Sequence, residues 1–166
     1  MGEKELRKHR GCFTGHRPEK LTVSEERLAA LLEAEIRKAI GQEFTTFITG
    51  MAKGTDLIAA EIVLRLREED PRLRLVAALP YPNFGQRWGG GWSERFQRVL
   101  STADQIECVC PCSSWASYQL RNEWMVNHSA LVIAAFNGES GGTKNTLDFA
   151  RKQRVPCVVI DIGGKL

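Results

Sequence analysis

The sequence predicts an α/β fold in which a mostly parallel sheet is covered by helices on both faces. Short apolar runs alternate with segments of helical periodicity along almost the whole chain, and this alternation is typical of a parallel sheet. With 166 residues, of which 43% are hydrophobic and 26% charged, the chain has the length and composition of one globular domain over residues 1–166. It contains no internal repeat, low-complexity tract or interdomain linker.

Each predicted element follows from its residue pattern. The clearest helix begins after Ser24, a suitable N-cap, and ends at Gly41; its apolar residues at helical spacing are Leu28, Leu31, Leu32, Ile36 and Ile40. Further helices are expected at 55–67, 93–102, 116–127 and 144–151. Strands are expected at 11–14, 44–49, 73–79, 105–110, 130–136 and 155–160, with 106–110 as a buried strand.

Charge and hydropathy restrict the classes of partner. A net charge of +3 is too small to indicate a dedicated nucleic-acid protein, so we do not expect nucleic acid as a partner. A solvated terminus explains the basic cluster of Lys4, Arg7, Lys8 and Arg10. No apolar run approaches the roughly 20 residues needed to cross a bilayer, and the first ten residues lack the apolar core of a signal peptide. We therefore expect a cytoplasmic protein with no membrane partner.

The five cysteines are an odd number and are expected to be reduced in the cytoplasm. Cys108, Cys110 and Cys112 alternate along the chain, so a strand could present three thiolates on one face to a metal. A fourth ligand is not evident, and the segment has the pattern of a buried strand. We therefore expect small buried hydrophobic side chains and no metal.

A glycine turn after the strand that ends at Thr49 is the most informative motif. Gly50, Met51 and Gly54 lead into Thr55 and Asp56, where a helix is expected to begin. Glycine lets a ligand approach the backbone closely, and the unpaired N–H groups of a first helical turn favour phosphate or carboxylate. A plain turn between a strand and a helix is the alternative reading.

A glycine turn after a predicted strand occurs at two further places in the chain. Gly15, His16 and Arg17 follow the first strand, with Pro18 closing the turn. The strand that ends at Phe136 is followed by a third turn, which includes Gly138, Gly141, Gly142 and Thr143. In an open parallel sheet, ligands bind outside the carboxyl ends of the strands, so the three turns are expected to share one rim.

Two further segments carry groups that a ligand could use. Arg121 and Asn122 lie in a predicted helix and offer donors suited to a phosphate or a base edge, unless they form a solvated helix face. Trp88 and Trp92 flank three glycines and could form an aromatic lid over a planar base. Packing against a neighbouring helix or a partner subunit would explain the tryptophans equally well.

Four ordered motifs, at residues 14–18, 50–56, 121–126 and 141–146, resemble the YpsA-like branch of the SLOG superfamily over about residues 11–161. That superfamily groups domains related to the Lonely Guy phosphoribohydrolases and to the DNA-processing protein DprA. The resemblance implies a Rossmann-like three-layer sandwich with a mostly parallel sheet. It also implies a pocket at the C-terminal edge of the sheet for a nucleotide or nucleotide-derived ligand, such as an ADP-ribose compound. We expect no resident cofactor. The pocket residues implied are Gly15, His16, Arg17, Gly50, Met51, Gly54, Asp56, Arg121, Asn122, Gly138, Gly141, Gly142 and Thr143.

The sequence departs from the catalytic relatives at Thr146, where the phosphoribohydrolases carry a glutamate. Glycosidic cleavage needs a carboxylate near the sugar, and the motif carboxylates that could substitute are Asp56 and Glu123. We favour a ligand-binding or sensor domain. There are two alternatives. One is an enzyme that cleaves a nucleotide's N-glycosidic bond, and the other is a single-strand nucleic-acid binder that uses residues 4–10 and Lys53. A homo-oligomer is also possible.

Overall fold

The computed structural model describes residues 2–164 and 166. Its centre is a six-stranded sheet with the order β4-β3-β2-β1-β5-β6, in which each neighbouring pair is parallel. The strands are β1 (Arg10–Gly15), β2 (Thr46–Thr49), β3 (Arg74–Leu79), β4 (Gln105–Cys108), β5 (Leu131–Phe136) and β6 (Cys157–Asp161).

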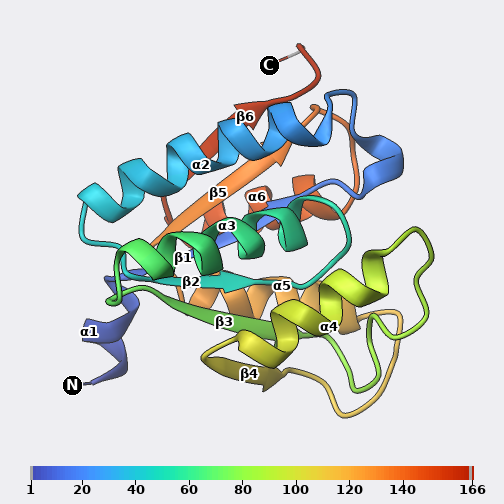
Figure 1. Ribbon diagram of the computed structural model, residues 1–166, viewed down its shortest axis with the longest axis horizontal. Coiled ribbons are helices and arrows are strands. Elements are labelled where there is room, and N and C mark those ends of the chain that lie inside the picture. The colour runs from blue at the N-terminus through green and yellow to red at the C-terminus, as the bar shows by residue number, and fades with distance from the viewer. Residues whose placement is uncertain (1, 165) are drawn as a thin grey trace.

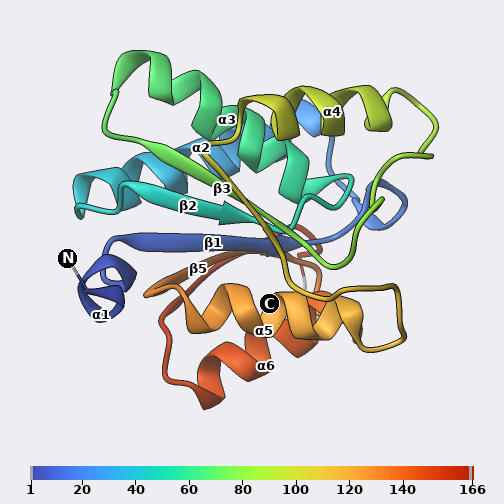
Figure 2. The same ribbon diagram turned by 90° about the horizontal axis from the view of Figure 1, so that it is seen from below.

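Helices cover both faces of this sheet (Figures 1 and 2). On one face lie α2 (Glu25–Gly41), α3 (Thr55–Glu69) and α4 (Trp92–Thr102), and on the other lie α5 (Ser117–Asn127) and α6 (Gly142–Lys152). The three-layer parallel α/β architecture predicted from the sequence is thereby confirmed. None of the helices in the described residues is long and apolar enough to cross a membrane.

The longest helix, α2, forms for the reasons that its sequence suggests. The Ser24 hydroxyl accepts a hydrogen bond from the backbone N–H of Arg27 at 3.1 Å, which caps the first turn. Leu28, Leu32 and Ile36 are fully buried, because their spacing places them on one face of the helix. Leu31 and Ile40 lie beside this face and are partly buried against the same core.

The sheet separates two hydrophobic cores. The larger core lies under α2, α3 and α4 and includes Phe13 and Phe47, whose rings stack at a centroid distance of 5.7 Å. The smaller core lies under α5 and α6 and includes Val132 and Leu147. All six residues of β5 are buried, as expected for an inner strand of a sheet covered on both faces.

Each element boundary lies within two residues of the predicted one, but one prediction about burial was wrong. The segment expected as a buried strand is the edge strand β4, which ends at Cys108 and in which Ile106 is 50% exposed. Among the described strands it pairs with β3 alone, so its apolar residues are less buried than their sequence pattern predicts. The basic terminus is largely solvent-exposed, as expected, although residues 3–7 form a short helix, α1 (Glu3–Arg7), and Arg10 pairs with Glu3.

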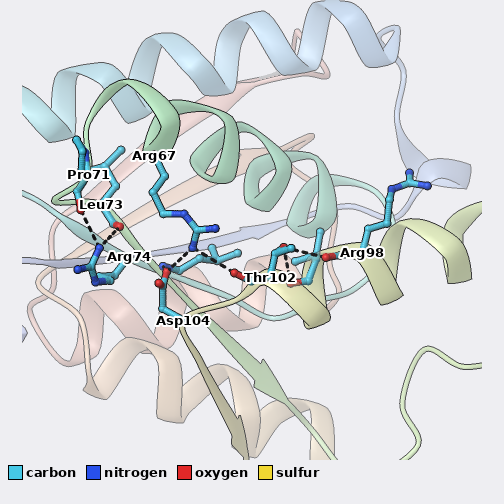
Figure 3. Close-up of polar contacts among 9 residues, drawn as sticks. Arg67, Pro71, Leu73, Arg74, Arg98, Thr102 and Asp104 are labelled. Carbon is cyan, nitrogen blue, oxygen red and sulfur yellow. Dashed lines mark hydrogen bonds and ion pairs between the residues drawn. The ribbon is translucent and has the colours of Figure 1, made fainter.

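Polar contacts link the end of α3 to the end of the sheet where β3 and β4 begin (Figure 3). Arg67 at the end of α3 donates to the Thr102 carbonyl at 3.1 Å and to the Asp104 carboxylate at 2.8 Å. Asp104 in turn accepts a hydrogen bond from the backbone N–H of Leu75 at 2.8 Å. These contacts join the end of α3 to the starts of β3 and β4, and the cavity described below lies at the opposite end of the sheet.

The order of the strands reverses at β1. The chain passes from β1 outward through β2, β3 and β4, and then returns to the other side of β1 to form β5 and β6. The carboxyl ends of β1 and β5 therefore form a topological switch point, where the two following loops diverge to opposite faces of the sheet.

Candidate ligand site at the switch point

A cavity of about 280 Å³ opens at this switch point. Its walls come from the turn after β1, the turn after β2, the first two turns of α5 and the first turn of α6. Its lining residues are Thr14, Gly15, His16, Arg17, Glu19, Lys20, Ala52, Asp56, Tyr118, Arg121, Asn122, Gly142 and Thr143. The three glycine turns thus meet at one rim, as the sequence predicted.

The predicted site residues divide into two groups. Those on the cavity wall are Gly15, His16, Arg17, Asp56, Arg121, Asn122, Gly142 and Thr143. Those outside the wall are Gly50, Met51, Gly54, Glu123, Gly138 and Gly141. Met51 is fully buried in the larger core, which makes it a packing residue. Glu123 is not among the lining residues, so Asp56 is the motif carboxylate on the cavity wall.

Gly15 and Gly54 allow two segments of the chain to pack closely against each other. A Cβ on Gly15 would stand 2.6 Å from Thr55 Cβ, and a Cβ on Gly54 would stand 2.7 Å from the His16 carbonyl oxygen. Gly54 also has a φ of +92°, which disfavours other residues. These glycines let the turn after β1 lie directly on the start of α3, where the Thr55 hydroxyl donates to the His16 carbonyl at 3.0 Å.

Gly50 separates the two buried charges of the site. A Cβ on Gly50 would stand 2.8 Å from Asp56 Oδ2 and 2.9 Å from Arg121 Cζ. The carboxylate and the guanidinium therefore both pack against the bare Cα of this residue. A glycine here allows Asp56 and Arg121 to face each other across the backbone at the end of β2.

Asp56 is 7% exposed and only partly satisfied. Its Oδ2 accepts a hydrogen bond from the backbone N–H of Ala52 at 3.3 Å, whereas its buried Oδ1 has no partner among the described residues. Burial raises the pKa of Asp56 to about 6, even though the charge of Arg121 and the Ala52 N–H act in the opposite direction. A buried carboxyl of this kind beside a cavity is typical of functional sites.

Arg121 is 4% exposed and faces the sheet, so the functional alternative for this residue, and not the solvated helix face, agrees with the structure. Its Nη1 donates to the Gly50 carbonyl at the end of β2 and, at 3.4 Å, to the Ala78 carbonyl in β3. Its Nε donates to Asn122 Oδ1 at 2.8 Å. Burial lowers the pKa of Arg121, but an arginine retains its charge at neutral pH.

His16 is buried on the β5 side of the cavity. Its Nε2 accepts a hydrogen bond from the backbone N–H of Asn137 at 3.1 Å, so the neutral ring carries its proton on Nδ1. Burial lowers the pKa of His16, and the nearby charge of Lys20 acts in the same direction. His16 is therefore a neutral donor to the cavity near pH 7.

Two exposed cations stand at the mouth of the cavity. Arg17 and Lys20 follow β1, and Lys20 ends a short 3-10 helix (Pro18–Lys20) that starts at the predicted proline. Glu19 between them also lines the cavity, so the mouth carries both signs of charge. Lys20 and Tyr118 were missed in the sequence, because a lone lysine and a first-turn tyrosine carry no motif of their own.

The first turn of α6 is open toward the cavity. Its N-cap is Gly141, with a φ of +143°, and no side chain in the described residues caps the helix. Gly142 and Thr143 lie on the cavity wall, and a Cβ on Gly142 would meet nothing within 4 Å. Backbone N–H groups of this turn are therefore available to an anion.

The two tryptophans do not form the suggested lid. Trp88 packs edge-on against Phe84 and Phe96, at centroid distances of 5.0 and 5.6 Å, and Trp92 lies 4.3 Å from the guanidinium of Arg95. Neither contributes to the cavity wall. The packing alternative is the correct one for these residues.

The cysteines around β4 differ in burial. Cys110 is buried, whereas Cys108 and Cys112 are exposed, so the expectation of three buried side chains was wrong for two of them. Strand β4 ends at Cys108, and beyond it the alternating strand geometry no longer applies. Among residues 2–164 and 166, no cluster of three or more His, Cys, Asp or Glu side chains could hold a metal ion.

The fold and the cavity together define a Rossmann-like α/β protein with a glycine-lined cleft at the switch point. The chain belongs to the YspA SLOG family, whose model matches residues 11–161. The resemblance identified in the sequence is thereby confirmed.

Relatives of known sequence support this family. The SPbeta prophage-derived protein YoqJ of Bacillus subtilis is 30% identical over 139 residues, which cover 76% of this chain and 80% of YoqJ. A UPF0398 protein of Bacillus pumilus is 28% identical over 142 residues, which cover 80% of this chain and 75% of that protein.

Solved structures show the same fold at low identity. DNA processing protein A (DprA) of Helicobacter pylori superposes with a TM-score of 0.64 at 17% identity, over 95% of this chain and 66% of that chain. DprA of Streptococcus pneumoniae superposes with a TM-score of 0.66 at 16% identity, over 93% of this chain and 50% of that chain. The present chain thus spans about two thirds and one half of these proteins.

Proposed function

We propose that the protein binds a nucleotide or nucleotide-derived ligand, such as an ADP-ribose-like molecule, in the cavity at the switch point. The observation that carries this proposal is the uncapped first turn of α6, which opens into a cavity that also holds Lys20 and Arg17. Helix N-termini at such positions favour phosphate, and exposed cations add charge complementarity. A volume of about 280 Å³ lies at the lower end of the usual range for small-molecule sites.

The geometry favours α6 over α3 as the phosphate site. Lys20 Nζ lies 3.9 Å from the position that a Cβ on Gly141 would take, so a cation stands directly beside the start of α6. The start of α3 is already occupied, because the Thr55 N–H donates to the His16 carbonyl at 3.3 Å. The Asp56 carboxylate accepts a hydrogen bond from the Ala52 N–H in the same turn, and its negative charge would repel a phosphate.

Asp56 and His16 suit the uncharged part of such a ligand. Asp56 lines the cavity, and its unpartnered Oδ1 is a buried acceptor that would have to turn toward a ligand to bind it, while Nδ1–H of His16 is a donor. Sugar hydroxyl groups both donate and accept hydrogen bonds, so a ribose is a suitable ligand for this pair.

The test is Gly142→Val with Gly41→Val as the matched control. Both glycines have open space around a Cβ and ordinary φ values, so both variants are expected to fold with similar melting temperatures. Only Gly142 lines the cavity, where the added side chain would keep a phosphate away from the backbone. Titration calorimetry with AMP and ADP-ribose should give at least about tenfold weaker binding for Gly142→Val, a loss of about 1.4 kcal/mol, and no change for Gly41→Val. Unchanged affinity in a folded Gly142→Val protein would place the phosphate elsewhere.

A second candidate is cleavage of a nucleotide's N-glycosidic bond. It is favoured by Asp56, whose pKa is raised to about 6 by burial and which can therefore exchange a proton near neutral pH. The glutamate of the phosphoribohydrolases is replaced by Thr146, whose hydroxyl donates to the Gly142 carbonyl at 2.9 Å. Release of free base from nucleoside monophosphates or from NAD, abolished by Asp56→Asn, would support this candidate; binding without turnover would refute it.

The expectation that nucleic acid is not a partner needs correction. It depended on the small net charge alone, yet one protein of the same fold is described by its single-stranded DNA binding mode, DprA of H. pylori. The cationic mouth formed by Arg17 and Lys20 could equally receive the phosphate of a strand. Affinity for an oligonucleotide that falls steeply between low and moderate salt would favour this partner over a mononucleotide.

A further inference from the structure

We propose that Arg17 and Tyr118 form a clamp that holds the planar base of the ligand, so that the site selects nucleotides over sugar phosphates. This inference rests on the proposed function and specifies the class of ligand. Both residues line the cavity, and Arg17 Cζ lies 5.8 Å from the centroid of the Tyr118 ring. One face of the ring is therefore directed toward a cation.

The tyrosine is the rigid half of this clamp. Its hydroxyl shares a hydrogen bond of 3.0 Å with the hydroxyl of Tyr81. Its ring meets Tyr81 and Phe84 edge to face, at centroid distances of 5.9 and 6.0 Å. These contacts fix the orientation of the ring, yet Tyr118 is still 36% exposed. An ordered aromatic surface with a free face is what base stacking requires.

The arginine is the adjustable half. Arg17 is exposed and makes no ion pair or hydrogen bond through its side chain with the described residues, in contrast to Arg121, which is buried and donates to two backbone carbonyls. A planar base stacked between the two groups needs them about 7 Å apart, which is twice a contact distance of roughly 3.5 Å. Arg17 therefore has to move by only about 1 Å to admit a base.

The position of the clamp agrees with that of the phosphate site. Tyr118 comes from the first turn of α5, and Lys20 stands beside the first turn of α6, so the two lie on different walls of the same cavity. A ligand with a phosphate at one end and an aromatic base at the other would satisfy both. Inorganic phosphate or a sugar phosphate would use one wall only.

The experiment compares AMP with ribose 5-phosphate, which carries the same phosphate and sugar but no base. Stacking of one base contributes about 1–3 kcal/mol, so wild-type protein should bind AMP about 5-fold to 150-fold more tightly than ribose 5-phosphate. Tyr118→Leu should reduce this ratio toward one while the affinity for ribose 5-phosphate stays the same. Tyr118→Phe keeps the ring and should keep the ratio. Melting curves verify that each variant is folded.

The outcomes separate the two proposals. Equal affinity of wild-type protein for the two ligands would refute the clamp and leave the phosphate site standing. An equal loss for both ligands in Tyr118→Leu would show that the ring only shapes the wall, which also refutes the clamp. If wild-type protein binds neither of these ligands nor ADP-ribose, the proposed function fails, and the clamp fails with it.

Discussion

Replacing Asp56 by asparagine should stabilise the protein at neutral pH. The carboxyl is 7% exposed, and burial raises its pKa from an ordinary value of 3.8 to about 6. The folded state therefore disfavours the ionised carboxyl. Above pH 6 the carboxyl is ionised in both states, so its burial lowers the free energy of unfolding. Asparagine has the shape of the neutral carboxyl and can still accept the hydrogen bond from Ala52.

The magnitude follows from the shift of about two pKa units. Each unit corresponds to about 1.4 kcal/mol, so ionisation of Asp56 costs about 3 kcal/mol of folding free energy. Because the folded pKa is the higher one, the penalty is absent below pH 4, grows as the pH rises from about 4 to 6, and is constant above that. For a chain of this length, 3 kcal/mol corresponds to about 6–12 °C in melting temperature.

The assay is thermal or urea unfolding of wild-type protein and Asp56→Asn at pH 7.5 and pH 4. The variant should be more stable by the full amount at pH 7.5 and equal to wild type at pH 4. Asp148→Asn, at an exposed carboxylate on α6, serves as the control and should change stability by less than about 1 kcal/mol at either pH. A variant that is no more stable than wild type at pH 7.5, or a difference that does not depend on pH, would refute the reasoning.

Two further predictions concern residues outside the cavity wall. Gly50→Ala should destabilise the fold by about 1–3 kcal/mol in urea unfolding, because its Cβ would stand 2.8 Å from Asp56 Oδ2 and 2.9 Å from Arg121 Cζ, whereas Gly41→Ala at an open helical position should not destabilise it. Elemental analysis of the purified protein should find no stoichiometric zinc, since Cys108, Cys110 and Cys112 belong to no cluster of three metal-binding side chains in the described residues; one zinc per chain would contradict this.

Local patterns were enough to predict the elements and the fold class. Ser24 and the spacing of Leu28, Leu32 and Ile36 define α2 without tertiary information, because capping and periodicity act within a few residues. The position of β4 at the sheet edge was beyond such reasoning. An apolar strand has the same local pattern whether one neighbour covers it or two, and the order of strands is set by contacts between distant segments.

The site shows the same division. Glycine turns after parallel strands predicted the rim, because strand polarity alone brings their ends together. Gly15, Gly50 and Gly54 were expected to let a ligand approach the backbone. In the structure, each of them instead leaves room for atoms of the chain itself, which a Cβ would contact too closely. Distances between segments far apart in sequence decide such roles. For Trp88, the fold of the loop before α4 decides the role, since it brings the ring against Phe84 and Phe96.

The proposed ligand binding would account for an arrangement of Gly50, Asp56 and Arg121 that costs folding free energy. An asparagine at position 56 would accept the same Ala52 N–H without the cost of about 3 kcal/mol that the ionised carboxyl carries. Arg121 does not remove that cost, and Asp56 Oδ1 has no partner in the described residues. In the proposed complex, this buried acceptor would gain a partner if the carboxyl turned toward a ligand hydroxyl. Asp56→Asn should therefore bind AMP more weakly than wild-type protein while being more stable, and a variant that binds as well as wild type would assign the carboxylate to the fold alone.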